Sequence, residues 1–184
     1  MTQTASFSGP KTFRRVCGVL GLLAAGSVLA GGLGSTARAE ESLLPVPQAV
    51  SVATGGASIG GAIQVGWDTR PSPLLLRAVA RFTTRLTAIA GPAGQGSPYV
   101  LHVSAGSDRA YLSVDEKERY ALTTSATGAR LEADGPAGVI HGLATLLQLV
   151  RVTPEGASVE RVHIDDAPRF AWRGLLMDVA RHFD

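Results

Sequence analysis

Cysteine is almost absent from this sequence of 184 residues, in which Cys17 is the only example. One cysteine cannot form an intramolecular disulfide or a zinc site built on several thiolates. Histidine is scarce as well, and His102, His141 and His163 are scattered, whereas metal-binding histidines usually stand at short, regular spacings. We therefore expect neither a metal nor a cofactor.

A run of apolar residues long enough to cross a membrane is also missing. Residues 1–39 have a basic opening, an apolar run over residues 16–30 and a small-x-small cleavage site at residues 37–39, which is the order of an export signal peptide. The apolar run is shorter than the ~20 residues of a spanning helix, so we expect no stable membrane anchor. We predict a secreted or periplasmic protein that begins near Glu40, exported by the general secretory route or, given Arg14-Arg15, by the twin-arginine route.

The excess of basic residues disappears when that leader is removed. The sequence has 17 Lys and Arg against 15 Asp and Glu, but residues 1–39 contain four of the basic residues and no acidic one. The remainder has 13 basic and 15 acidic residues, a net charge of −2. A mildly acidic chain gives no argument for nucleic acid as a partner.

Strand patterns dominate what is present after the leader. Apolar and polar residues alternate, or short β-prone runs occur, around residues 49–52, 62–67, 99–103, 120–125, 129–133 and 158–164. The fourth and fifth of these flank Thr127-Gly128 and predict a hairpin. The run of charged residues 115–119 before that hairpin is interpreted as a solvated loop.

Two helix patterns lie between the strands. Ser72-Pro73 and Asp134-Gly135-Pro136 are helix starts with a capping side chain and an early proline, and Gly91-Pro92 ends the first helix. Each start is followed by an apolar stripe, formed by Leu75, Val79, Phe82, Leu86 and Ile89 in one helix and by Ile140, Leu143, Leu147 and Val150 in the other. Arg77, Arg81 and Arg85 are interpreted as a solvated face of the first helix. Together these elements predict an α+β fold with one mostly antiparallel sheet and two helices on one of its faces.

A different pattern closes the sequence. Pro168 turns the chain away from helix, and Leu175-Leu176-Met177 is continuously apolar, like a parallel strand covered on both faces. We predict three parts: a signal peptide (1–39), an α+β domain (40–166) and the first strand of a truncated (β/α)8 barrel (167–184). The pair Asp165-Asp166 is interpreted as part of the linker, and Phe170 and Trp172 as core or interdomain packing.

Two motifs carry a family resemblance. Asp-x-Pro-Arg-Phe-x-Trp-Arg-Gly at residues 166–174, three apolar residues and Asp-Val-Ala-Arg-His-Phe at residues 178–183 resemble the first barrel strand of β-N-acetylhexosaminidases of glycoside hydrolase family twenty. Residues 135–149 resemble a helix of the small domain that precedes that barrel. The resemblance implies an enzyme that removes terminal N-acetylglucosamine or N-acetylgalactosamine from glycans or chitooligosaccharides.

The resemblance also assigns residues. In the family the substrate's acetamido group attacks the anomeric carbon while an Asp-Glu pair assists. That pair lies downstream of Asp184, so we expect no catalytic residue here and no hydrolysis by this chain alone. Arg173 matches an arginine that binds sugar hydroxyls, a task that suits the fixed fork of guanidinium donors. Asp178 and Arg181 are supporting residues. By position alone Asp178 is the better candidate, and a buried Asp178–Arg181 ion pair is the alternative.

Two other functions stay open at this point. A similar small domain precedes the barrels of retaining glycosidases with other specificities, although the Trp172-Arg173-Gly174 match argues against them. The second alternative is a carbohydrate-binding or accessory domain without catalysis, which the end of the sequence at Asp184 would suit.

Overall fold

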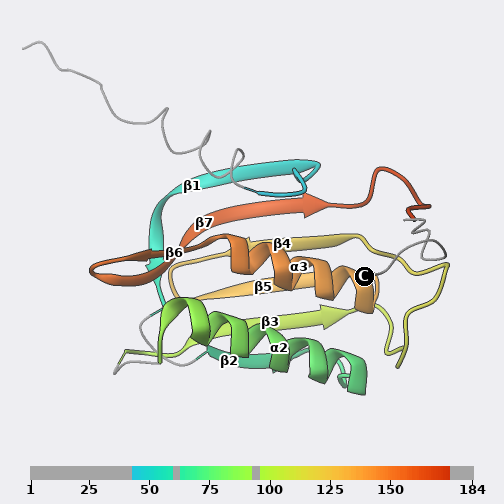
Figure 1. The fold of residues 1–184 in the computed structure, drawn as a ribbon, viewed down its shortest axis with the longest axis horizontal. Coiled ribbons are helices and arrows are strands. Elements are labelled where there is room, and N and C mark those ends of the chain that lie inside the picture. Colours follow the sequence, from blue (N-terminus) through green and yellow to red (C-terminus); the bar gives the residue numbers. More distant parts are fainter. Residues whose placement is uncertain (1–42, 60–62, 93–95, 175–184) are drawn as a thin grey trace, which may run out of the picture. The chain divides into compact units, whose positions relative to one another are not determined.

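The computed structural model describes residues 43–59, 63–92 and 96–174, which form two helices and one seven-stranded sheet (Figure 1). The predicted signal peptide and the predicted barrel strand lie outside the described residues. In chain order the elements are β1 (Ala49–Ser58), β2 (Ile63–Trp67), α2 (Pro73–Ala90), β3 (Tyr99–Ala105), β4 (Tyr120–Thr124), β5 (Gly128–Ala133), α3 (Pro136–Gln148), β6 (Val150–Thr153) and β7 (Gly156–Asp166).

The sheet is mixed. Its strand order is β1-β7-β4-β5-β3-β2, and β6 pairs with β7 off this path. The pairs β2–β3 and β3–β5 are parallel, while the other four pairs are antiparallel. The parallel pair β2–β3 is possible because α2 supplies the crossover that such a pair requires. The predicted α+β fold with a mostly antiparallel sheet is confirmed.

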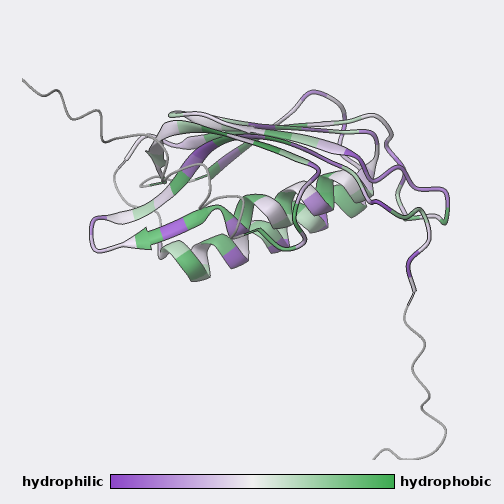
Figure 2. Ribbon diagram, turned by 90° about the horizontal axis from the view of Figure 1, so that it is seen from above, coloured by the Kyte–Doolittle hydropathy of each residue, from purple (hydrophilic) through white to green (hydrophobic). Residues whose placement is uncertain are grey.

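Both helices lie on the same face of the sheet, as Figure 2 shows. The core fills the space between them, because alternate residues of each central strand point toward the helices. Four of these side chains are completely buried: Leu101, Leu122, Leu131 and Ile164. Burial of each such side chain stabilises the fold by about 1.5–3 kcal/mol relative to exposure.

Helix α2 follows its local sequence signals closely. The Leu75 amide donates to Ser72 Oγ at 3.4 Å, and Pro73 is the first helical residue. At the other end, Gly91 adopts a positive φ of 80° and its amide donates to the Thr87 carbonyl. The predicted stripe is buried at Leu75, Phe82 and Leu86, whereas Val79 is half-buried and Ile89 is exposed. The three predicted surface arginines, Arg77, Arg81 and Arg85, are exposed.

Helix α3 begins one residue later than its sequence suggests. Gly135, not Asp134, is the N-cap, and no side chain caps the helix. The amide of Asp134 instead donates to the carbonyl of Arg119 at 3.1 Å, because residue 134 still belongs to the end of the β4–β5 hairpin. The predicted aspartate cap is therefore wrong.

The buried face of α3 also differs from the predicted stripe. Val139, Leu143 and Leu146 are buried, whereas Ile140 and Leu147 are only half-buried and Val150 belongs to β6. The helix is turned this way because Gly138 and Gly142 face the sheet at very short range. A Cβ on Gly142 would lie 2.3 Å from Leu131 Cδ1. Among the described residues, no helix is long and apolar enough to span a membrane.

The end of the domain contains one element that the sequence patterns missed. Strand β6 pairs with the start of β7 through a tight turn at Pro154-Glu155. Strand β7 then continues to Asp166, so Asp165 and Asp166 are strand residues and their assignment to a linker was wrong. As neighbours in a strand they point to opposite faces of the sheet.

Candidate functional site

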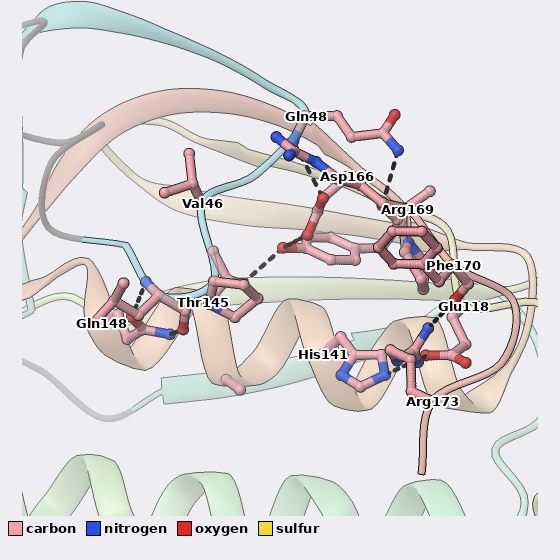
Figure 3. Close-up of a pocket in the computed structure, with 16 residues that line it drawn as sticks. Val46, Gln48, Glu118, His141, Thr145, Gln148, Asp166, Arg169, Phe170 and Arg173 are labelled. Atoms are coloured by element: carbon pink, nitrogen blue, oxygen red, sulfur yellow. Dashed lines mark hydrogen bonds and ion pairs between the residues drawn. The ribbon is translucent and has the colours of Figure 1, made fainter.

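A cavity of about 580 Å³ lies beside α3 at the β1–β7 side of the sheet. Helix α3 packs over β3, β4 and β5, so within the described residues the neighbouring strands β7 and β1 have no helix of their own above them (Figure 1). The walls of the cavity come instead from residues 44–48 before β1, from the outward side of α3, and from Asp166 at the end of β7 together with residues that follow it up to Arg173 (Figure 3).

The lead-in to β1 is fixed to the end of α3 by a two-way contact. The amide of Leu44 donates to Gln148 Oε1 at 2.9 Å, and Gln148 Nε2 donates back to the Leu44 carbonyl at 3.0 Å. Because both polar groups of the Gln148 side chain are used, residue 44 is held in place against the helix. This contact closes one side of the cavity.

Asp166 connects three elements at the floor of the cavity. Its Oδ1 accepts from the amide of Gln48 at 3.2 Å, and its Oδ2 accepts from the hydroxyl of Tyr120 at 3.1 Å. The Tyr120 and Thr145 hydroxyl oxygens are 2.7 Å apart. Burial raises the pKa of Tyr120, and the negative charge of Asp166 raises it further. The phenol therefore stays protonated and remains a donor to Asp166 at neutral pH.

A charged cluster lies at the mouth of the cavity, where Glu118 faces His141 and Arg173 (Figure 3). Glu118 Oε2 accepts from His141 Nε2 at 2.9 Å and from Arg173 Nη2. Arg173 Nη1 also donates to the backbone carbonyl of Phe170 at 2.7 Å. The Glu118 side chain is the least exposed of the three, at 19%. We call these three residues the rim cluster.

Close packing of a loop against α3 places Glu118 in the rim cluster. A Cβ on Gly135 would lie 3.1 Å from the carbonyl oxygen of Lys117, and a Cβ on Gly138 would lie 2.5 Å from the carbonyl oxygen of Arg119. Only glycine allows a backbone to approach this closely. The segment before β4 therefore lies directly on the first turns of α3, beside His141.

The predicted substrate-binding residue, Arg173, lies in this cluster, and its role in sugar binding stays a prediction. The supporting residues Asp178 and Arg181 lie outside the described residues. Phe170 and Trp172 have exposed fractions of 71% and 80%, so they lie outside the core of the described domain, and their packing against another domain stays a prediction.

Sequence reasoning missed Glu118, His141 and Asp166 as cavity residues. No local signal could have found them, because their partners are distant: Glu118 contacts residues 23 and 55 positions away, and Asp166 contacts residues 46 and 118 positions away. The interpretation of the run 115–119 as a solvated loop is wrong for Glu118.

A second polar cluster lies on the opposite face of the sheet. His163 Nδ1 is 2.8 Å from Thr123 Oγ1, and His163 Nε2 is 3.0 Å from Asp165 Oδ2. Arg119 also pairs with Asp165 at 3.3 Å. These side chains lie on a half-exposed surface outside the cavity, so we assign them to the surface of the sheet.

The chemistry of the cavity follows from these contacts. Its two carboxylates, Glu118 and Asp166, each accept two hydrogen bonds, and the part of the chain that the structure describes contains no cluster of His, Cys, Asp and Glu suited to a metal ion. Among the described residues, Arg173 has partners for two of its five N–H donors, which leaves three. The described residues thus form an α+β domain whose cavity has an arginine at its rim and two carboxylates that are both hydrogen-bonded.

The family of the chain follows from its sequence. The sequence profile of glycosyl hydrolase family 20, domain 2, matches residues 40–167. This match covers well over half of the sequence, and the chain belongs to glycosyl hydrolase family 20.

Known proteins of this family resemble the chain in sequence and in structure. The β-hexosaminidase of Vibrio furnissii is 47% identical over 64 residues, which are 35% of this chain and 10% of that protein. The structure of the Flavobacterium johnsoniae chitobiase matches with a TM-score of 0.68 and 29% identity, over 77% of this chain and 23% of its own. The exo-β-N-acetylglucosaminidase of Vibrio harveyi, in complex with N-acetylglucosamine, has a TM-score of 0.59 and 25% identity, over 79% and 22% of the two chains. The matches therefore cover only 10% to 23% of these three proteins.

Proposed function

We propose that this chain is the amino-terminal portion of an exported β-N-acetylhexosaminidase. The observation that carries the proposal is the family match over residues 40–167, which runs directly into the Trp172-Arg173-Gly174 motif. The names of the similar proteins support the reaction class, because they are a β-hexosaminidase, a chitobiase and an exo-β-N-acetylglucosaminidase. The proposed substrates are glycans or chitooligosaccharides that end in N-acetylglucosamine or N-acetylgalactosamine.

The proposed mechanism is retaining hydrolysis with assistance from the substrate. The acetamido oxygen of the terminal sugar attacks its own anomeric carbon, while a glutamic acid protonates the departing oxygen and a neighbouring aspartate orients the acetamido group. Water then opens the cyclic intermediate. Both carboxylates of this pair would belong to the part of the barrel that is encoded after residue 184.

In this mechanism Arg173 binds the terminal sugar. The three N–H donors that it retains can reach two neighbouring hydroxyls of one ring in a forked arrangement. Such contacts are made with the substrate and with the transition state alike, so they contribute mainly to the affinity for the sugar.

The decisive experiment is to read the coding sequence past codon 184, express the complete product and assay it with an aryl β-N-acetylglucosaminide. We expect turnover by the complete product and none by residues 40–184 alone. Turnover by residues 40–184 that one substitution within them abolishes would contradict the proposal. So would a downstream sequence without an Asp-Glu pair.

An accessory domain that binds carbohydrate without catalysis is the second candidate. The cavity favours it, because a volume of about 580 Å³ with a charged rim suits a small polar ligand. Calorimetric titration of residues 40–184 with N-acetylglucosamine and with its β-1,4-linked dimer separates the two candidates. Saturable heat from residues 40–184, together with no activity of the complete product, would favour the accessory role.

A further inference from the structure

We infer that Glu118 is a positioning residue for Arg173, with His141 as its support. The inference rests on the proposed function, in which Arg173 binds hydroxyls of the terminal sugar. It adds that the α+β domain takes part in sugar binding through one carboxylate, although it supplies no acid or base to the reaction.

Two contacts fix the guanidinium of Arg173. Glu118 Oε2 accepts from Nη2, and the Phe170 carbonyl accepts from Nη1 at 2.7 Å. With both terminal nitrogens held, the plane of the guanidinium is set before a ligand arrives. A side chain that is already ordered loses less freedom on binding, so its ligand binds more tightly. The three remaining N–H donors keep their ability to bind hydroxyls.

Glu118 is suited to this task because it is itself well fixed. Its side chain is 19% exposed, against 46% for Arg173 and 50% for His141, so it is the best shielded member of the rim cluster. A shielded ion pair is weakened less by solvent and salt than one on the open surface. The close contacts at Gly135 and Gly138 fix the backbone on either side of Glu118 against α3.

His141 supports the carboxylate from the other side. Its Nε2 is 2.9 Å from the same Oε2 atom that Arg173 uses, and it comes from a helix rather than from a loop (Figure 3). A second partner on that oxygen restricts the rotation of the carboxylate. Glu118 therefore connects Arg173 to α3. In the sequence it lies 55 positions before Arg173 and 23 positions before His141.

The test measures Glu118→Gln in the complete enzyme, alone and combined with Arg173→Ala. Glutamine keeps the size of the side chain but loses the charge. We expect KM for an aryl β-N-acetylglucosaminide to rise about fivefold with little change in kcat, because a partly shielded ion pair is lost. In the Arg173→Ala background the same change should have no effect, because Glu118 acts only through Arg173.

Glu132→Gln is the matched control. It breaks another carboxylate–arginine pair, with Arg130 at 2.8 Å, on the opposite face of the sheet. We expect it to leave KM unchanged in both backgrounds. If Glu118→Gln does not fold, Glu118→Asp, which keeps the charge and shortens the side chain, is measured in the same two backgrounds with the same expected pattern.

The outcomes separate the inference from the proposed function. An inactive complete product, or normal kinetics in Arg173→Ala, would contradict the assigned function of the protein or of Arg173. An active enzyme that loses affinity in Arg173→Ala, but in which Glu118→Gln has equal effects in both backgrounds or none at all, would overturn the inference alone. Calorimetric affinity for N-acetylglucosamine gives the same comparison without turnover.

Discussion

The backbone carbonyl oxygen of Arg119 lies against Gly138, 2.5 Å from the position that a Cβ at residue 138 would occupy. This contact joins the end of the β3–β4 loop to the first turn of α3. It is made with a backbone atom, so the neighbour cannot move aside by rotation of a side chain. The position of Glu118, which immediately precedes Arg119, therefore depends on a glycine in α3.

We expect Gly138→Ala to destabilise the domain. An alanine in a helix is ordinarily favourable by about 1 kcal/mol relative to glycine, but here its methyl group would collide with the loop. Overpacking of this kind costs about 1–3 kcal/mol, which exceeds or cancels the helical gain. Urea unfolding followed by circular dichroism measures the difference.

Ala144→Gly is the control for the difference in helix propensity between alanine and glycine, because Ala144 is on the same helix and exposed. It should lower the free energy of unfolding by about 1 kcal/mol. A Gly138→Ala variant that is more stable than the wild type by that amount would show that the loop moves freely and that the contact fixes nothing.

Stability should fall at strongly alkaline pH because of Tyr99. Burial raises the pKa of this phenol from 10.0 to about 12 in the folded state. Above pH 10 the unfolded chain releases the proton while the folded chain retains it, so the free energy of unfolding falls as pH rises. The loss should be complete near pH 12 and amount to roughly 2–3 kcal/mol.

Tyr99→Phe removes the titrating group and is the matched variant. Its free energy of unfolding should fall less steeply between pH 10 and pH 12 than that of the wild type, as measured by urea unfolding at a series of pH values. Parallel curves for the two proteins would contradict the role given to Tyr99.

The features that could be predicted from the sequence are those that a few neighbouring residues determine. Ser72 and Pro73 start α2 because a hydroxyl and a fixed φ suffice for that purpose, and the strand alternation follows from the two faces of a sheet. The rotation of α3 could not be predicted in this way. Val139 and Ile140 are adjacent in the sequence and both are apolar. The close approach of Gly138 and Gly142 to the sheet turns Val139, and not Ile140, into the core.

The candidate site was harder to predict than the fold. Arg173 was found through a motif, whereas Glu118 stands in a run of charged residues with no periodicity. Its partners come from α3 and from the segment after β7, so the contact exists only once the sheet has formed. Asp166 shows the same limit, since its partners Gln48 and Tyr120 come from the lead-in to β1 and from β4.

Trp172 should report whether further chain covers the exposed aromatic segment. Its exposed fraction is 80%, and the only other tryptophan is Trp67, so Trp67→Phe leaves one emitter. In the 184-residue chain we expect red-shifted fluorescence that acrylamide quenches readily. In the complete product we expect a blue shift and protection, because packing of further chain against this exposed indole would remove it from water. Equal quenching in both would contradict interdomain packing at Trp172.

The mature protein should begin near Glu40 and be found outside the cytoplasm. The order of basic, apolar and small residues over positions 11–39 motivates this prediction. Amino-terminal sequencing of the exported protein checks it. A sequence that starts at Met1, or inside residues 16–30, would contradict the assignment of the signal peptide.

Arg173→Ala in the complete enzyme should impair sugar binding far more than folding. Hydrogen bonds from a charged group contribute about 1.5–3 kcal/mol each, so the loss of two should lower kcat/KM for an N-acetyl substrate by well over tenfold, mainly through KM. Arg173→Lys should not restore it, because an ammonium group lacks the forked geometry of the guanidinium. Stability should fall only modestly, because the Arg173 side chain is 46% exposed and its contact with Glu118 lies at the rim of the cavity.

Asp178→Asn is the contrasting variant. Asp178 stands at the end of the predicted barrel strand, and by position alone it would be a better candidate than Arg173 for binding the sugar. If Asp178 serves only as the ionic partner of Arg181, its replacement should lower the melting temperature at least as much as it lowers activity. Kinetics and thermal unfolding of the wild type and the three variants distinguish these roles. Near-normal kinetics in Arg173→Ala, together with lost binding and an intact fold in Asp178→Asn, would show that Asp178 binds the sugar and that Arg173 does not. The position of a residue along the strand would then be a better guide to its role than the motif match.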